Sequence, residues 1–135
     1  MKVYIDTNVL VDFVCRRDVF FEPAKALFAI GYIGQVKLIM SSLSVLNAVY
    51  IGRKYGSTQI KEKLKLLSHF VEIVDLASDI VISELTSNWK DYEDAVQNRS
   101  AIKINADCIV TRNKSDFVLS SLPAYTVEEF LNIFK

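Results

Sequence analysis

Three aspartates of this sequence are spaced so that they could meet at one site and bind a metal ion. Asp6 follows the apolar run VYI, Asp94 lies in DYEDAVQ, and Asp116 lies in TRNKSDF. Converging carboxylates repel one another and are costly to desolvate, so such a cluster needs a neutralising cation. Mg²⁺ and Mn²⁺ prefer carboxylate oxygens, and either ion can polarise a phosphate and activate water. The three acids therefore predict hydrolysis of a phosphate ester.

Each of these acids also has a purely structural explanation. Asp6 could cap the helix that follows it, and Asp94 could be a first-turn acid favoured by the helix dipole. Asp116 could cap a short turn over residues 117–120. Three further acids are expected in surface, outer-shell or structural positions: Asp91, Glu93 and Asp107. With one histidine and two separate cysteines, a zinc site is not expected.

Apolar periodicity predicts the elements that would position the acids. Strands are expected over residues 3–5, 36–40, 71–76, 107–111 and 124–126. Helices are expected from Thr7, over 23–32, over 43–55 with Gly56 as the end, from Ser57, and over 78–85, 91–105 and 127–134. Expected helix caps are Thr7, the pair Ser41 and Ser42, and the capping box of Thr126 with Glu129.

Strands that alternate with helices predict one α/β domain over residues 1–135, with a short, mainly parallel central sheet and helices on both faces. Ligands of open parallel sheets bind beyond the C-terminal ends of the strands. Asp6 follows the first strand and Asp116 follows the fourth, so both are expected at that edge. Asp91 and Asp94 are three residues apart and share a helix face, which Glu93 does not.

The composition limits the kinds of protein that this chain could be. Of its 135 residues 51% are hydrophobic, which indicates a folded globule. Sixteen basic and sixteen acidic residues cancel, so a nucleic-acid partner would need a local basic patch. Cys15 and Cys108 lie among apolar residues and are expected as buried thiols in a reducing compartment. We expect a cytoplasmic protein, since the sequence shows no signal peptide and no membrane-length apolar run.

Four segments resemble the PIN-domain family, in the right order and at the right spacing: DTNVLVDF, SSLSVLNAVY, DYEDAVQ and ADCIVTRNKSDF. Within that family they are similar to small bacterial VapC-like toxins. The resemblance implies a PIN-like three-layer α/β/α sandwich and a ribonuclease that uses Mg²⁺ or Mn²⁺ to hydrolyse RNA phosphodiester bonds. It also implies a toxin–antitoxin pair, with an antitoxin protein as partner and a homodimeric toxin.

The resemblance also implies roles for individual residues. Asp6, Asp94 and Asp116 match the catalytic acids that hold the metal. The positions expected to support them are Thr7, Asn8, Asp91, Thr111 and Asn113. A phosphodiesterase also needs cations for the RNA phosphates. Arg112 and Lys114 flank the site loop and are the predicted RNA-binding residues, while Arg16, Arg17, Arg53 and Lys54 lie at expected helix ends.

Asn47 departs from the family's pattern, because a glutamate usually occupies this place in the third helix. Asn47 is expected to point toward the aspartates, from a helix whose Leu43, Leu46 and Tyr50 pack against the sheet. An amide can still ligate a metal, but it removes one negative charge, so metal affinity should fall. Asn47 and Asn113 motivate an alternative: a catalytically weakened PIN-fold protein that binds RNA or a protein partner without cleavage.

Other protein classes fit less well. A haloacid-dehalogenase-type phosphatase would need an aspartate where Asn8 stands, a receiver domain would need an acidic pair at Asp6, and a Rossmann unit would need glycines after the first strand. Aromatic residues of the early helices are candidates for a dimer surface, although a buried position is expected for each: Phe20, Phe21, Tyr32 and Tyr50. His69 is expected as a packing or interface residue.

Overall fold

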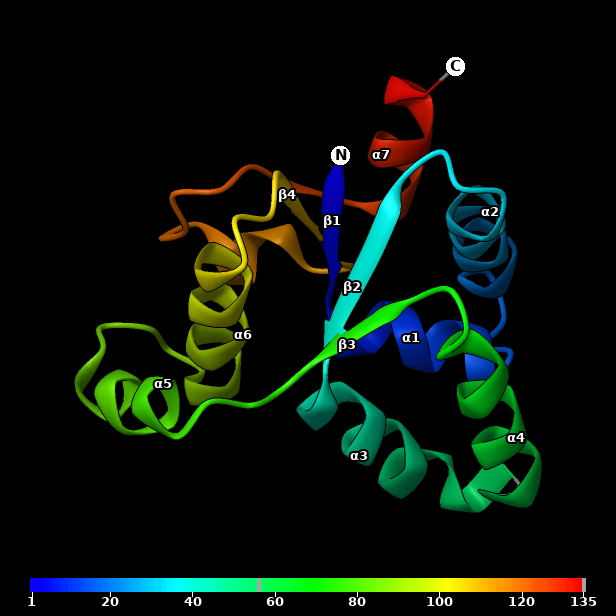
Figure 1. Cartoon of the computed structure of the whole chain (residues 1–135), viewed down its shortest axis with the longest axis horizontal. Helices are drawn as coiled ribbons and strands as arrows, with labels where there is room; N and C mark the ends of the chain where they lie inside the picture. Colours follow the sequence, from blue (N-terminus) through cyan, green and yellow to red (C-terminus); the bar gives the residue numbers. More distant parts are fainter. Residues whose placement is uncertain (56, 135) are drawn as a thin grey trace.

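A five-stranded parallel sheet forms the centre of the molecule (Figure 1). The computed structural model describes residues 1–55 and 57–134. The strands lie in the order β3-β2-β1-β4-β5, and all four neighbouring pairs are parallel. Their bounds are Lys2–Ile5 (β1), Lys37–Ser41 (β2), Glu72–Val74 (β3), Cys108–Val110 (β4) and Ala124–Tyr125 (β5). The predicted parallel sheet is confirmed.

Helices connect the strands throughout the part of the chain that the structure describes. The α-helices are Thr7–Val14 (α1), Phe21–Tyr32 (α2), Ser42–Ile51 (α3), Ser57–Leu67 (α4), Ser78–Ser83 (α5), Tyr92–Lys103 (α6) and Val127–Ile133 (α7). Short 3₁₀ helices cover Gly52–Tyr55 (η1), Glu84–Thr86 (η2) and Lys114–Phe117 (η3). The capping box predicted for the last helix is present. The side chain of Thr126 accepts a hydrogen bond from the backbone N–H of Glu129, and the side chain of Glu129 accepts one from the backbone N–H of Thr126.

Side chains of the strands alternate between two apolar clusters, one on each face of the sheet. Val3 and Ile5 of β1 join the larger cluster, which α1, α2, α4 and α7 cover. Tyr4 points to the opposite face and joins the smaller cluster, which α6 covers through Ala101. Strands β2 and β4 alternate in the same way. The three-layer α/β/α arrangement is therefore confirmed, and Figure 1 shows α6 on one side of the sheet and α1, α2 and α4 on the other.

The strand order reverses at β1. From β1 the chain proceeds outward to β2 and β3, then returns to the other side of β1 and continues through β4 to β5. In open α/β sheets, ligands bind beyond the C-terminal ends of the strands at such a reversal. Asp6 directly follows β1, and residues 111–116 directly follow β4. Both segments therefore reach the edge where a ligand site is expected.

Several helix boundaries differ from the prediction, and two of these differences, the start of α1 and the end of α3, have a clear structural reason. Thr7 does not cap α1: Asp6 is the N-cap, and its Oδ1 accepts a hydrogen bond from the backbone N–H of Thr7. Helix α3 ends at Ile51, not at residue 55, and a 3₁₀ turn starts at Gly52. A Cβ at Gly52 would lie 2.2 Å from Cδ1 of Ile60, so α4 packs against a position that needs glycine. Gly56, the predicted helix end, lies outside the described residues.

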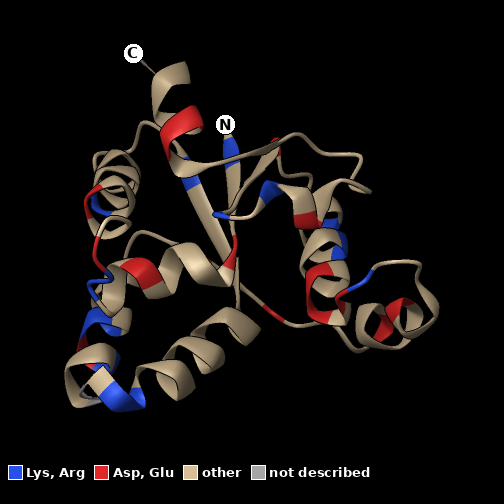
Figure 2. Ribbon diagram, turned by 180° about the vertical axis from the view of Figure 1, so that it is seen from behind, with Lys and Arg blue, Asp and Glu red and all other residues tan. Residues whose placement is uncertain are grey.

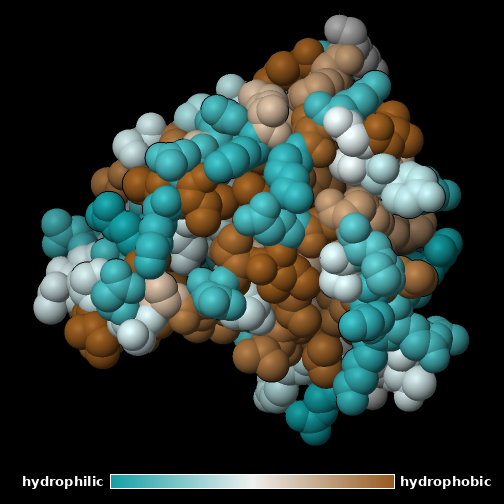
Figure 3. Space-filling view, viewed as in Figure 1, coloured by the Kyte–Doolittle hydropathy of each residue, from teal (hydrophilic) through white to brown (hydrophobic). Residues whose placement is uncertain are grey.

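The predicted burial of several side chains is wrong. Leu46 and Tyr50 are each 69% exposed, because α3 turns the small residues Ser44 and Ala48 toward the core. Figure 3 shows apolar surface over the region where α3 and β3 lie in Figure 1. Phe20 and Tyr32, two of the early-helix aromatic residues expected to be buried, are also exposed. His69, expected as a packing or interface residue, is exposed.

The cysteines behave as predicted. Cys15 and Cys108 are buried and carry free thiols. Burial raises the pKa of Cys108 to about 11, so its thiol is protonated at neutral pH. Among the residues that the structure describes, no helix combines the length and the apolar character needed to cross a membrane.

Candidate active site

Asp6 lies at the junction of β1 and α1, and the local fold fixes both of its carboxylate oxygens. As the N-cap of α1, Oδ1 accepts a hydrogen bond from the backbone N–H of Thr7 at 2.9 Å. Oδ2 accepts a hydrogen bond from Oγ1 of Thr111 at 2.9 Å. The backbone N–H of Asp6 donates to the carbonyl of Val110 at 3.0 Å, which extends the pairing of β1 with β4. The carboxylate is thus held in one orientation at the edge of the sheet.

The electrostatic surroundings of Asp6 disfavour its ionised form. The side chain is buried, and burial raises the pKa of Asp6 to about 6, although hydrogen bonds from Thr111 and Thr7 act in the opposite direction. The carboxylates of Glu93 and Asp116 raise the pKa of Asp6 further. Within residues 1–55 and 57–134, no basic side chain forms an ion pair with Asp6. A nearby cation would stabilise this carboxylate.

The first turn of α6 brings further acids to the same region, and Figure 2 shows acidic residues gathered at this end of the helix. Asp91 is the N-cap, and its Oδ1 accepts a hydrogen bond from the backbone N–H of Asp94 at 3.0 Å. Asp94 is half-buried, and burial raises its pKa to about 7. The carboxylates of Asp6, Asp91, Asp116 and Glu93 raise the pKa of Asp94 further, so Asp94 lies within electrostatic reach of all four.

Asp116 lies inside the 3₁₀ turn η3 and does not cap residues 117–120. A pocket of about 400 Å³ is lined by Asp116 together with Asp91 and Asp94 of α6. The structure therefore brings these three acids to one pocket. As the side chains stand, no group of three or more Asp, Glu, His or Cys residues in the described part of the chain is close enough to hold a metal ion. Metal ligation by the aspartates stays a prediction.

Sequence reasoning missed a buried polar network centred on Gln97. Its Nε2 donates to Oγ1 of Thr7 at 3.2 Å and to Oγ of Ser44 at 3.0 Å. Its Oε1 accepts hydrogen bonds from Oγ of Ser41 at 3.2 Å and from the hydroxyl of Tyr4. The network ties α6 to α3 and to the ends of β1 and β2. The signal in the sequence was a glutamine on the buried face of a helix, because a buried amide needs hydrogen-bond partners.

The predicted supporting residues differ in what they contact. Thr111 holds Asp6, and its Oγ1 also accepts a hydrogen bond from the backbone N–H of Asn113 at 3.2 Å. The hydroxyl of Thr7 belongs to the buried network. Among the described residues, the side-chain amides of Asn8 and Asn113 have no hydrogen-bond partner, and Asn113 is exposed. Asp107 has a structural role, since its Oδ2 accepts a hydrogen bond from the backbone N–H of Lys2 at 2.7 Å.

Asn47 makes its side-chain contact with Glu93. Its Nδ2 donates to Oε1 of Glu93 at 2.5 Å, across the gap between α3 and α6. Glu93 was expected as a solvated surface or outer-shell acid, off the helix face of Asp91 and Asp94. Its side chain is exposed, and its carboxylate raises the pKa of both Asp6 and Asp94. Glu93 is thus electrostatically part of the acid cluster.

Both predicted RNA-binding cations are paired within the chain. Nη1 of Arg112 lies 3.6 Å from Oδ1 of the buried Asp12, and its guanidinium lies over the ring of Phe20 at 4.3 Å. Nζ of Lys114 lies 2.7 Å from Oε2 of Glu129. Asp12 and Glu129 thus neutralise charges that were expected to meet phosphates. Phosphate binding by either cation stays a prediction.

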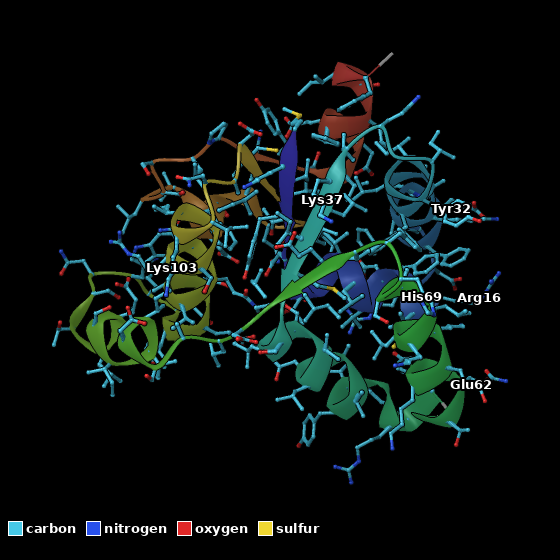
Figure 4. The ribbon with its side chains drawn as sticks, in the orientation of Figure 1. Arg16, Tyr32, Lys37, Glu62, His69 and Lys103 are labelled. Atoms are coloured by element: carbon cyan, nitrogen blue, oxygen red, sulfur yellow. The ribbon has the colours of Figure 1, made fainter. Side chains whose placement is uncertain are left out.

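Lys90 is a basic residue that sequence reasoning missed. It lines the same pocket as the acids, next to Trp89. Figure 4 shows Arg16 beyond α2 and α4, on the side of the molecule away from α6. Arg53 and Lys54 lie in η1 and line a different pocket. Lys90 is therefore the basic residue placed in the pocket with the acids.

The donor atoms at this edge suit a hard divalent cation. The side chains gathered there offer carboxylate oxygens, with hydroxyl and amide groups behind them, and the pocket is lined by neither thiol nor imidazole. The buried Asp6 carboxylate and the half-buried Asp94 carboxylate both need positive charge nearby. Mg²⁺ or Mn²⁺ meets both requirements, so the residues present fit such an ion.

Solved structures with a similar fold include three bacterial toxin proteins. VapBC2 from Rickettsia felis, bound to a DNA fragment from its promoter, is 20% identical with a TM-score of 0.67, over 93% of this chain and 98% of that chain. A toxin–antitoxin complex from Klebsiella pneumoniae is 22% identical with a TM-score of 0.68, over 93% and 97%. VapC20 from Mycobacterium tuberculosis, a toxin that cleaves the sarcin–ricin loop, is 14% identical with a TM-score of 0.65, over 79% and 86%.

Sequence comparison gives the family. No curated protein sequence matches the chain. The family model described as a PIN domain matches residues 2–115, which include the first strand, the start of α6 and the loop after β4. The chain therefore belongs to the PIN-domain family.

Proposed function

We propose that this chain is a single PIN domain that acts as a divalent-metal-dependent endoribonuclease, the toxin of a toxin–antitoxin pair. The observation that carries the proposal is the buried Asp6 carboxylate, which has acids of α6 and η3 around it and no basic partner among the described residues. Membership of the PIN-domain family supports a nuclease. The likeness in fold to toxins of toxin–antitoxin systems supports the toxin assignment.

The proposed reaction is hydrolysis of an RNA phosphodiester bond. A Mg²⁺ or Mn²⁺ ion held by Asp6, Asp94 and Asp116 would supply a Lewis acid that activates water and neutralises phosphate charge. Thr111 and the backbone N–H of Thr7 orient the Asp6 carboxylate for that role. Water adds to phosphorus, the bond from phosphorus to the 3′ oxygen breaks, and the products are a 5′-phosphate and a 3′-hydroxyl.

Lys90 and Trp89 are the proposed RNA contacts beside the acids. Both line the pocket of about 400 Å³, and Lys90 is exposed and has no ion pair within the described residues. A lysine offers a point charge to a phosphate, and an aromatic ring offers a stacking surface to an unpaired base. Arg112, the earlier candidate, is held by Asp12 and is assigned a lesser role.

The proposed toxin has two protein partners, an antitoxin and a second copy of itself. The similar structures from Rickettsia felis and Klebsiella pneumoniae are a VapBC pair and a toxin–antitoxin complex. On this chain, α3 exposes Leu46 and Tyr50, which provide apolar surface for a protein partner. We place the protein in the cytoplasm, where its RNA substrate would be.

The proposal is tested with wild type, Asp6→Asn and Asp18→Asn. Asp18 is an exposed aspartate without a hydrogen bond or ion pair in the described part of the chain, so its variant controls for loss of one charge. We expect wild type and Asp18→Asn to bind Mn²⁺ in calorimetry and to cleave single-stranded RNA. Asp6→Asn should bind Mn²⁺ about 10–100-fold more weakly and should lose cleavage. Equal Mn²⁺ affinity in all three proteins would contradict the proposal.

A second function is favoured by the amides of Asn47 and Asn113, which stand where acids would add charge to the site. In this alternative the chain binds RNA or a protein partner without cutting. It predicts that wild type retains RNA in a filter-binding assay, that Lys90→Ala weakens this binding, and that Mn²⁺ causes no cleavage. Metal-dependent cleavage that Asp6→Asn abolishes would exclude it.

A further inference from the structure

A pocket outside the acid cluster lies between the starts of α2 and α7 and the segment that follows β4. This α2–α7 pocket has a volume of about 310 Å³ and is lined by Phe20, Pro23, Arg112, Thr126, Val127 and Glu128. Figure 1 shows α2 and α7 on the side of the sheet away from α6. The volume is at the small end of the range of about 300–1,000 Å³ typical of ligand pockets, so the pocket suits one compact chemical group.

Hydrogen bonds of the backbone and of one side chain place the α2–α7 pocket next to Asp6. Arg112 directly follows Thr111, whose hydroxyl donates to Oδ2 of Asp6 at 2.9 Å. Thr126 directly follows Tyr125, whose carbonyl accepts a hydrogen bond from the backbone N–H of Thr111 at 2.9 Å. The pocket is therefore within reach of a nucleotide that adjoins a phosphodiester bond held at Asp6.

The guanidinium group of Arg112 forms a fixed, flat part of the pocket lining. Its Nη1 lies 3.6 Å from Oδ1 of the buried Asp12, and its central carbon lies 4.3 Å from the centre of the Phe20 ring. Nη1 of Arg17 lies 3.5 Å from the same oxygen, so Asp12 is held from a second side. Among the described residues, no acceptor forms a hydrogen bond with the guanidinium of Arg112. Its N–H groups are thus donors in a fixed plane, which suits the edge of a planar ligand.

Phe20 and Glu128 add an aromatic surface and an acceptor. Phe20 directly precedes α2 and is 37% exposed. Glu128 is exposed in the first turn of α7 and has no hydrogen bond or ion pair among the described residues. Aromatic rings stack on unpaired bases, and a carboxylate accepts hydrogen bonds from their N–H groups. An apolar side chain of a protein partner would instead cover both charged groups without pairing either, which is costly.

We propose that the α2–α7 pocket binds an unpaired base of the RNA substrate, and that guanine is the preferred base. This inference rests on the proposed function and adds sequence specificity to it. Guanine offers the acceptors O6 and N7 to Arg112, and it offers the N1–H and the N2 amino group as donors to Glu128. Adenine carries an amino group in the place of O6, so it cannot accept from Arg112 there.

Equilibrium binding of short RNAs tests the pocket apart from cleavage. The probes are uridine pentanucleotides with a guanosine, adenosine, cytidine or uridine at the centre, titrated in EDTA so that metal-dependent cleavage is absent. We expect wild type to bind the guanosine RNA about tenfold more tightly than the other three. Phe20→Leu removes the aromatic ring and should weaken that binding about tenfold. Phe134→Leu is the matched control, because Phe134 is 38% exposed and lines no part of this pocket.

Two further variants separate base recognition from stacking and from folding. Glu128→Gln is a change at an exposed position, and it should reduce the preference for guanosine to within about threefold while adenosine RNA binds as before. Glu62→Gln is its control, since Glu62 is an exposed glutamate of α4 without a hydrogen bond or ion pair among the described residues. Phe20→Tyr keeps an aromatic ring and should bind like wild type. Melting curves establish that each variant is folded.

The results for the pocket and for the proposed function can be told apart. Equal affinity of wild type for all four RNAs, or for none of them, would overturn the base site, and Mn²⁺-dependent cleavage by the same protein would leave the proposed function intact. Unchanged RNA binding in Phe20→Leu, with dissociation of a wild-type dimer in light scattering, would make the pocket a protein contact. A guanosine preference that Glu128→Gln removes, without cleavage in Mn²⁺, would support the base site and overturn the ribonuclease.

Discussion

At the residue scale, Asp6 combines two roles that the sequence presents as alternatives. One carboxylate oxygen caps α1 through the N–H of Thr7, and the other is held by the hydroxyl of Thr111. The cap fixes the direction of the carboxylate, which a metal ligand needs. The cost is desolvation, which raises the pKa of Asp6 to about 6. Capping and metal binding are therefore compatible, because each uses a different lone pair.

The raised pKa values predict how the stability of the metal-free protein depends on pH. Asp6 and Asp94 have folded-state pKa values of about 6 and about 7, against the ordinary value of 3.8. Between about pH 4 and pH 7 the folded state holds protons that the unfolded state has released, so the free energy of unfolding falls as pH rises. For Asp6 the loss is about 2–3 kcal/mol. Asp94 is partly exposed and adds less.

Urea unfolding in EDTA at pH 5 and pH 7.5 checks this prediction. The free energy of unfolding should fall less from pH 5 to pH 7.5 in Asp6→Asn than in wild type, because asparagine keeps the cap but does not titrate. At pH 7.5, Mn²⁺ should stabilise wild type and leave Asp6→Asn unchanged. A variant whose pH dependence matches that of wild type would show that the Asp6 carboxylate is not destabilising in the folded state.

At the scale of elements, the first turn of α6 concentrates the acids. Asp91 caps the helix, and Glu93 and Asp94 occupy its second and third positions. Negative charge is favourable at a helix N-terminus, by about 0.3–1 kcal/mol per group at exposed sites, which offsets part of the repulsion among the carboxylates. A helix start is thus a place where a protein can gather acids at limited cost to stability.

Asp91 provides a test of how that turn is built. Asp91→Ser keeps a capping oxygen for the N–H of Asp94, and Asp91→Ala does not, while both remove the charge. In EDTA, we expect the free energy of unfolding of Asp91→Ala to be about 1 kcal/mol lower than that of Asp91→Ser. If Asp91 only supports the site, Mn²⁺ affinity should fall by no more than about tenfold in Asp91→Ser.

Two results would contradict the role assigned to Asp91. Equal stability of the serine and alanine variants would mean that the cap contributes nothing measurable. Loss of Mn²⁺ affinity as large as that of Asp6→Asn would make Asp91 a ligand itself and would change its assigned role. Melting curves and calorimetry on the same preparations separate these outcomes.

At the scale of the whole molecule, the two faces of the sheet are buried and the site lies at the edge where the strand order reverses. Acids come to this edge from the junction of β1 with α1, from the start of α6 and from η3. Elsewhere the surface is partly apolar: on α3, Leu46 and Tyr50 are exposed because the small residues of that helix face the core. An exposed apolar stripe of this kind is typical of a surface that contacts another protein.

We expect the chain to form a homodimer through α3. Light scattering should give a dimer for wild type and a monomer, or a dimer at least tenfold weaker, for the variant Leu46→Lys/Tyr50→Lys. Tyr32→Lys is the control, because Tyr32 is equally exposed but lies on α2, where its ring packs edge-on against Phe70. A strict monomer of wild type at high concentration would contradict the dimer, and dissociation by Tyr32→Lys would move the interface to α2.

Local patterns in the sequence were sufficient for the parallel sheet, the helix order and the placement of Asp6 and Asp116 at its edge. The apolar spacing that predicts a strand or a helix involves residues of one element only. The same holds for a helix cap such as that of Thr126 with Glu129. These features depend on neighbours in the chain, which is why a single sequence reveals them. The departure at Asn47 came instead from the resemblance to the PIN-domain family, which gives the residue type usual at that place.

Only the tertiary structure decided which side chains meet. The hydrogen bond of Asn47 joins it to Glu93, 46 residues away, and Thr111 reaches Asp6 from 105 residues away. Arg112 is held by the buried Asp12, although its position in the sequence suggested a phosphate contact. Such pairings depend on distances between segments that folding brings together. Periodicity within one element carries no information on those distances, and for that reason the partners of a charge could not be read from the sequence.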